Sequence, residues 1–135
     1  MLYIVWLRLY TLFYKVEAVI FMAKIPTQML KGILENAILL IIAQGETYGY
    51  ALQQQLAQNG FGNVPEGTIY PLLLKLQQQG WIQGYKKSSN TGPDRKYYQI
   101  TLQGQQQLQI FMPQWQQLQH AMARLMEQQW EVNYE

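Results

Sequence analysis

The side chains that carry most enzyme chemistry are scarce in this sequence. Its 135 residues include no cysteine, one histidine (His120) and one aspartate (Asp94). Disulfides and thiolate metal sites are therefore excluded, and neither a two-histidine zinc site nor a pair of aspartates for magnesium can be assembled. The glutamates are scattered over separate segments. We therefore expect no catalytic residues, no metal site and no cofactor, and an enzyme is the last of the alternatives.

The basic side chains are concentrated in one part of the chain. Five of the ten lysines and arginines lie between Thr68 and Thr101, where Asp94 is the only acidic residue. They are Lys75, Lys86, Lys87, Arg95 and Lys96. The net charge of +2 alone would not indicate a nucleic-acid-binding protein, but a local cluster of cations is typical of a phosphate-binding surface. The alternative is the solvated edge of a hairpin.

A helix must position the first of these cations. In the segment "GTIYPLLLKL", which starts at Gly67, apolar residues recur at helical spacing and predict a buried stripe. The stripe consists of Ile69, Leu72, Leu73 and Leu76. The opposite face carries Gly67, Pro71, Leu74, Lys75 and Gln78, with Thr68 and Tyr70 on its shoulders. We expect Pro71 in the first turn, where a missing N–H costs nothing, and the helix end at Gly80.

The other four cations flank the predicted turn of a β-hairpin. The runs "WIQGYKK" and "RKYYQIT" are rich in aromatic and β-branched residues and enclose "SSNTGPD", which has the composition of a loop. Two helices are predicted before this region. One covers about Gln28 to Gln44 and stops at Gly45, and the second covers Tyr48 to about Asn59 with Thr47 as its N-cap.

A long helix is predicted from Leu102 to about Trp130, with Thr101 as its N-cap and a kink at Pro113. Its apolar residues alternate in steps of three and four, the spacing of a heptad seam. They are Leu108, Phe111, Trp115, Leu118, Met122 and Leu125. A helix of this kind has no partner within so small a domain, so a second copy of the chain is the simplest cover.

The first 21 residues are apolar and aromatic but are interrupted by Arg8, Lys15 and Glu17. Charges in mid-stretch argue against a spanning helix, and the pattern does not fit a cleavable signal peptide. Our preferred interpretation is an upstream extension over residues 1–21, caused by a mis-assigned start before Met22. The alternative is a membrane-associating segment that would make the protein a tethered regulator.

Three segments resemble the signature of PadR-type transcriptional regulators. They are "YGYAL" at Tyr48, "GTIYPLLLKLQQQGWI" from Gly67 and "GPDRKYYQITLQG" from Gly92. The order helix, helix, helix, hairpin is similar to a winged helix-turn-helix, over residues 22–101, followed by a C-terminal dimerisation helix over residues 102–135. The resemblance implies a homodimer, usually a repressor, that binds a palindromic DNA operator. A cytoplasmic location is expected because the absence of cysteine fits a cytosolic protein. A winged-helix adaptor that binds proteins instead of DNA is the rival interpretation.

The resemblance also implies roles for individual residues. The recognition helix would present Thr68, Tyr70 and Lys75, and the wing would contact phosphates through Arg95 and Lys96, with Lys86 and Lys87 beside them. At the start of the preceding helix, Tyr48 or Tyr50 would contact a phosphate while the other is buried. This sequence departs from the family pattern at Leu74, where relatives often have a basic residue, and at Asp94, which interrupts the basic wing.

A ligand site is suggested by the compact PadR-like subgroup that this chain resembles, which includes sensors of drugs and other aromatic compounds. Phe111, Met112 and Trp115 form an apolar cluster on the C-terminal helix. Paired across a two-fold axis, two Trp115 rings would line a slot for a planar aromatic effector. The alternative is that these residues only pack the core or the dimer interface.

Overall fold

The computed structural model describes residues 2–9, 24–89 and 91–132. The chain divides into two units, Met1–Leu30 and Lys31–Glu135. In the first unit, residues 2–9 and α2 (Thr27–Leu30) are helical. Most of the proposed extension over residues 1–21 lies outside the described residues. Over the ranges that are described, no helix is both long enough and apolar enough to cross a bilayer.

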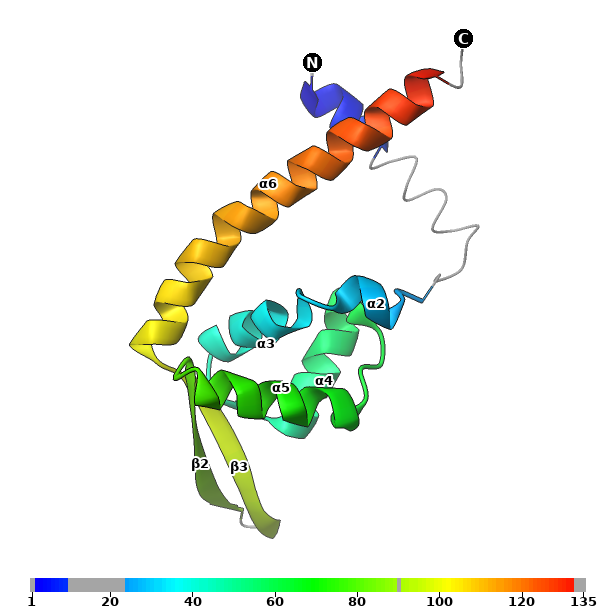
Figure 1. Cartoon of the computed structure of the whole chain (residues 1–135). Coiled ribbons are helices and arrows are strands. Elements are labelled where there is room, and N and C mark those ends of the chain that lie inside the picture. Colours follow the sequence, from blue (N-terminus) through cyan, green and yellow to red (C-terminus); the bar gives the residue numbers. More distant parts are fainter. Residues whose placement is uncertain (1, 10–23, 90, 133–135) are drawn as a thin grey trace. The chain divides into compact units, whose positions relative to one another are not determined.

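The second unit has the predicted order of three helices, a hairpin and a long final helix (Figure 1). Its elements are α3 (Leu34–Ala43), β1 (Thr47–Tyr48), α4 (Gly49–Leu56), η1 (Ala57–Phe61), α5 (Glu66–Gln78), β2 (Ile82–Ser89), β3 (Gly92–Ile100) and α6 (Leu102–Val132). This confirms the predicted winged helix-turn-helix, mainly helical with a small β-sheet, followed by a long helix.

The core of this unit lies between α3, α4 and α5. Each helix contributes apolar side chains spaced three or four residues apart, which places them on one face. The largest fully buried side chains are Ile38, Leu39, Ile42, Leu52, Leu56, Ile69, Leu73 and Leu76. The predicted stripe of α5 is thus confirmed at three of its four positions, and Leu72 is half-buried.

The predicted helix from Gln28 to Gln44 is interrupted. The backbone of Gly32 has a φ of 84°, and a turn separates the end of α2 at Leu30 from the start of α3 at Leu34. A residue in this left-handed conformation ends an α-helix, and glycine adopts it without a Cβ penalty. The prediction of one continuous helix was therefore wrong at this glycine.

The predicted start of the second helix was also wrong. Thr47 and Tyr48 form β1, which pairs with Tyr98 and Tyr97 of β3, so the sheet has three strands in the order β1-β3-β2. The helix α4 begins at Gly49, and its N-cap is Tyr48, without a side-chain cap bond. Thr47 is buried in the sheet instead of capping the helix. Pairing with a distant strand therefore prevails over the local preference of threonine for a cap.

Pro71 lies deeper in its helix than predicted. The N-cap of α5 is Pro65, whose carbonyl accepts hydrogen bonds from the N–H groups of Thr68 and Ile69. Pro71 is therefore in the second turn, where it cannot donate to the carbonyl of Gly67. Both residues are exposed, so water can reach that carbonyl and the helix continues to Gln78.

The hairpin extends further than its sequence predicts. The strand β2 continues through Ser89 and β3 starts at Gly92, so most of the expected loop "SSNTGPD" belongs to the strands. Asp94 is part of β3 and is exposed. Figure 1 shows the two strands projecting away from the helices as a wing. We call β2, β3 and their connection the wing.

The junction of the wing and α6 is tightly built. The hydroxyl of Thr101 accepts a hydrogen bond from the N–H of Gly104 at 3.0 Å and donates to the carbonyl of Gly80 at 2.7 Å, which confirms Thr101 as the N-cap. A Cβ added to Gly104 would collide with the carbonyl oxygen of Trp81. The helix α6 then continues through Pro113 to Val132, and the kink at Pro113 stays a prediction.

Candidate nucleic-acid interface

The four cations of the wing form two cross-strand pairs. Lys86 lies directly opposite Lys96, and Lys87 lies opposite Arg95. Because side chains alternate along a strand, the two pairs point to opposite faces of the sheet. The first pair shares its face with buried Ile82, and we call this the inner face. Like charges placed directly opposite each other destabilise a sheet, so this arrangement favours a bound polyanion.

Aromatic rings hold the cations on the outer face of the wing, which is the face that carries Lys87 and Arg95. The ring of Tyr97 lies between those of Tyr48 and Tyr85, with centroid distances of 5.3 and 6.2 Å. The guanidinium of Arg95 lies 4.6 Å from the centroid of Tyr48, and the ammonium of Lys87 lies 5.0 Å from that of Tyr97. Attraction between a cation and the face of a ring restricts these long side chains.

One cation of the outer face is already paired within the chain. The Nζ of Lys87 lies 2.9 Å from Oε1 of Glu46, in the segment before β1. The hydrogen bond and charge of this carboxylate raise the pKa of Lys87. A phosphate that binds Lys87 must therefore compete with Glu46.

The inner face connects the wing to α5. The ammonium of Lys96 donates a hydrogen bond to Oε1 of Gln77 at 3.3 Å and lies 5.6 Å from the ring centroid of Tyr98. A Cβ added to Gly84 would come within 2.6 Å of the Lys96 side chain and 2.8 Å of that of Gln77. The glycine thus leaves the space in which the lysine lies against the helix.

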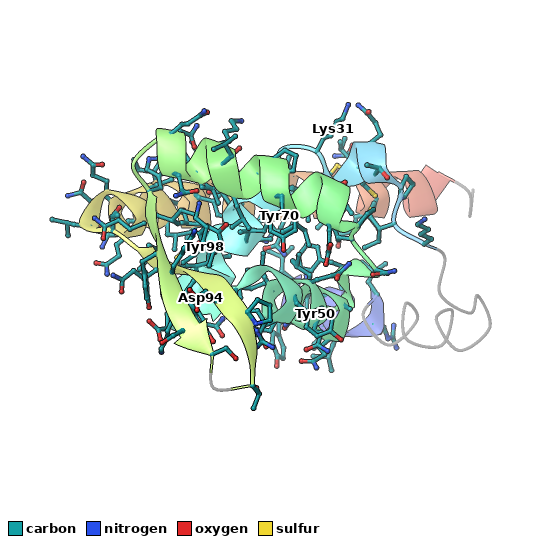
Figure 2. The ribbon with its side chains drawn as sticks, turned by 90° about the horizontal axis from the view of Figure 1, so that it is seen from below. Lys31, Tyr50, Tyr70, Asp94 and Tyr98 are labelled. Carbon is teal, nitrogen blue, oxygen red and sulfur yellow. The ribbon has the colours of Figure 1, made fainter. Side chains whose placement is uncertain are left out.

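The three predicted recognition residues lie on different sides of α5. Tyr70 points toward α4, where its hydroxyl would come 2.7 Å from a Cβ added to Gly49, and Figure 2 shows it between α5 and α4. Lys75 instead forms a 3.0 Å ion pair with Glu35 of α3. Thr68 is half-buried. Five residues of helix separate Tyr70 and Lys75 by about 140°, so the structure does not bring them to one spot.

The choice between Tyr48 and Tyr50 depends on tertiary packing. Tyr48 is half-buried under Arg95 and against Tyr97, whereas Tyr50 in the first turn of α4 is 55% exposed. Tyr50 is therefore the more accessible hydroxyl (Figure 2). The sequence by itself left this choice open.

The predicted ligand-site residues are on α6. The rings of Phe111 and Trp115 stack with centroids 6.5 Å apart and planes at 17°, and both residues are half-buried. Met112 is exposed and lies about 100° around the helix from Phe111. The structure therefore brings the two rings together and places the methionine on the neighbouring surface of the helix, three residues before Trp115.

The family model of PadR-like transcriptional regulators matches residues 38–110. The chain belongs to this family. The match includes most of α3, all of α4 and α5, the wing and the start of α6. PadR-like proteins are regulators of transcription and not enzymes, and no group of three potential metal-ligating side chains occurs among the residues that the structure describes.

Solved structures support this assignment. A PadR-like transcriptional regulator from Bacillus cereus is 48% identical, with a TM-score of 0.68, over 74% of this chain and 97% of its own. A Streptococcus transcriptional regulator is 43% identical, with a TM-score of 0.66, over 74% and 98%. A Lysinibacillus sphaericus protein described as uncharacterized is 27% identical over 76% of this chain and 96% of its own.

Two acidic residues of this PadR-like protein were missed by the sequence analysis. Glu35 and Glu46 pair with Lys75 and Lys87, and the partners are 40 and 41 residues apart in the chain. Charge patterning in one sequence shows contacts three or four residues apart on a helix, but it cannot show contacts at this separation. The sequence offered one indirect indication of these contacts. Acidic residues are few, eight in 135, so each of them is a candidate partner for a lysine or arginine.

Proposed function

We propose that this PadR-like regulator is a cytoplasmic homodimeric repressor that binds a palindromic DNA operator through α5 and the wing. The observation that carries the proposal is the pair of like-charged cross-strand contacts, Lys86 with Lys96 and Lys87 with Arg95, beside a helix with an exposed face. Phosphates would relieve the repulsion within each pair and would anchor the wing.

The helix α5 would enter the major groove, as the second helix of a helix-turn-helix does. Tyr70 would face the bases or the sugar-phosphate backbone, and Thr68 would contribute from the first turn. Lys75 would contact a phosphate only if its ammonium gave up the ion pair with Glu35 and bound the phosphate in its place. The hydroxyl of Tyr50, or of Tyr48 after a shift of Arg95, would reach a phosphate at the start of α4.

The helix α6 would form the dimer. Leu118, Met122 and Leu125 lie on its predicted seam and are 51%, 50% and 60% exposed, a pattern that a second copy would cover by packing the same face against its mate. The dimer would hold two copies of α5 about one helical turn of DNA apart, roughly 34 Å.

The effector would be a planar aromatic molecule bound where two copies of α6 meet. The stacked rings of Phe111 and Trp115 are half-buried within one chain, so part of each ring is available to a ligand, and Met112 would line the edge of the slot. By preferring one dimer geometry, the ligand would change the spacing of the two α5 helices and therefore the affinity for DNA.

DNA binding is tested by selecting duplexes from a random library with the full chain and measuring the affinity against salt concentration. We expect an enriched palindrome and a steep loss of affinity with salt. Lys96→Ala should weaken binding and flatten the salt dependence, whereas Lys31→Ala, an exposed lysine outside α5 and the wing, should change little. Failure to enrich any duplex would contradict the proposal and favour the protein adaptor.

The effector site is tested by the tryptophan fluorescence of the dimer. Titration with a planar aromatic cation should quench the emission, and Trp115→Ala should abolish the saturable part while the sequence-selected duplex still binds. If saturable quenching persists in Trp115→Ala, the ligand does not bind beside Trp115 and the proposed effector slot is wrong. The proposal of DNA binding would not be affected by that result.

A further inference from the structure

The outward face of α5 carries an exposed leucine. Leu74 is 56% exposed. One turn away on the same face are Tyr70, which is 48% exposed, Pro71 and Gln78. An exposed leucine is common by itself, but here helical spacing places a tyrosine and a proline beside it on the same face of α5. We call Tyr70, Pro71 and Leu74 the α5 strip.

Cations lie on both sides of this strip. On one side, Gln77 accepts a hydrogen bond from Lys96 of the wing. On the other side is Lys75, the residue after Leu74, whose ammonium is held by Glu35. An uncharged ridge between two cationic flanks is complementary to the major groove of DNA, where a floor of base edges lies between two rows of phosphates.

The floor of the major groove offers few apolar groups. Guanine, adenine and cytosine present hydrogen-bond donors and acceptors there, while thymine adds a 5-methyl group. A leucine pressed against donors and acceptors would remove them from water without replacing the lost hydrogen bonds, which costs free energy. Against a thymine methyl, the same leucine would bury apolar surface from both partners.

We propose that Leu74 is a specificity-determining residue that contacts the 5-methyl group of a thymine in each operator half-site. The inference rests on the proposed DNA-binding function and adds the identity of a recognised base. Tyr70 and Pro71 flank Leu74 and exclude water from the contact.

The test uses the duplex that the full chain selects from a random library, and it changes only methyl groups. Each thymine of one half-site is replaced in turn by uracil, which keeps the base pair and deletes the methyl. At one position we expect uracil to weaken binding about three- to fivefold, the value of one buried methyl group. If no thymine in the half-site shows a loss, the proposal is overturned.

The leucine is identified by repeating the series with Leu74→Ala. The variant should bind the thymine duplex more weakly than the wild type and should no longer distinguish thymine from uracil at the sensitive position. Leu102→Ala, a matched change at a leucine that is 69% exposed at the start of α6, should keep the discrimination. An unchanged uracil penalty in Leu74→Ala would assign the methyl contact to another residue and would overturn the proposal.

The two proposals fail differently. If the chain selects no duplex at all, DNA binding fails and the strip would be a docking surface for a protein. If the chain selects a duplex but is insensitive to every methyl, DNA binding stands and only the role of Leu74 is refuted. Because Leu74 lies outside the buried stripe of α5, its replacement should leave the melting temperature nearly unchanged, which circular dichroism checks.

Discussion

The ammonium nitrogen of Lys75 lies 3.0 Å from Oε2 of Glu35, so the only cation in the sequence of α5 is bound to α3. The carboxylate is mostly covered, with 16% of the Glu35 side chain exposed. Its other oxygen, Oε1, is buried with no hydrogen-bond partner in the described part of the protein. Lys75 therefore compensates a carboxylate that has lost much of its water, and a phosphate would have to replace that interaction.

This ion pair predicts that Lys75→Ala affects the fold as well as DNA binding. Removal of the ammonium leaves Glu35 covered and uncompensated, which should lower the free energy of unfolding by about 1 kcal/mol, since Lys75 itself is exposed. Urea denaturation measures the change. In the Glu35→Gln background, where no charge remains to be compensated, the same replacement should cost clearly less. An equal cost in both backgrounds would contradict a stabilising pair.

The contact of Lys87 with Glu46 predicts an acidic residue that weakens DNA binding. Glu46→Gln should release Lys87 for phosphate contact, tighten binding to a nonspecific duplex several-fold and increase the salt slope by about one. Fluorescence anisotropy measures both quantities. In a Lys87→Gln background, Glu46→Gln should have little effect. If the gain were the same with and without Lys87, it would reflect only long-range charge.

The packing of Tyr70 on Gly49 predicts opposite effects for two glycine replacements. A Cβ at Gly49 would come 2.7 Å from the hydroxyl and 2.9 Å from the ring carbon of Tyr70, so Gly49→Ala should destabilise the protein by about 1–3 kcal/mol. Gly67→Ala meets open space within α5 and should stabilise the helix by roughly 0.5–1 kcal/mol. Thermal unfolding compares the two, and equal melting temperatures would show that Tyr70 is not held there.

Tyr98 predicts a loss of stability at alkaline pH. Burial raises the pKa of its phenol above the ordinary value of 10.0, and Tyr70 adds to the effect. Between the two pKa values the folded state keeps the phenol proton while the unfolded state releases it. The contribution of Tyr98 to the free energy of unfolding is therefore fully present below pH 10 and declines as the pH rises through the folded-state pKa.

Tyr98→Phe removes this titration. We expect its stability to fall less steeply than that of the wild type above pH 10, measured by urea denaturation at several pH values. Lys87, whose pKa is also raised, contributes a decline in the same range, so the comparison is repeated in Lys87→Gln. If the wild type and Tyr98→Phe had parallel profiles, the buried phenol would not be responsible.

The exposed seam of α6 predicts a dimer that a charge can break. Met122→Glu, at a side chain that is 50% exposed on the seam, should place two carboxylates in the interface and shift sedimentation from dimer to monomer. Gln117→Glu introduces the same charge at an exposed position off the seam and should leave the dimer intact. If the wild type itself sediments as a monomer, the proposal that α6 forms a dimer interface is wrong.

Much of the fold could be predicted from local patterns. The stripe of Ile69, Leu73 and Leu76 predicted a buried helix face because helical spacing brings residues three and four apart together. Thr101 was predicted as a cap because its hydroxyl needs only an N–H three residues later. Local preference failed at Thr47, where a distant strand supplies the competing partner.

The site was only partly predictable for the same physical reason. By itself, the sequence determined which segments form α5 and the wing, because their hydrophobic and turn patterns depend on neighbours within one or two turns, and it fixed where the cations fall along them. Tertiary structure alone decided that Glu35 and Glu46 bind two of those cations and that Tyr50 is more accessible than Tyr48, whereas the outward position of Leu74 was already predicted by helical spacing and is confirmed. Such contacts join residues about forty positions apart, and they form only when burial of the core brings the helices and the sheet together.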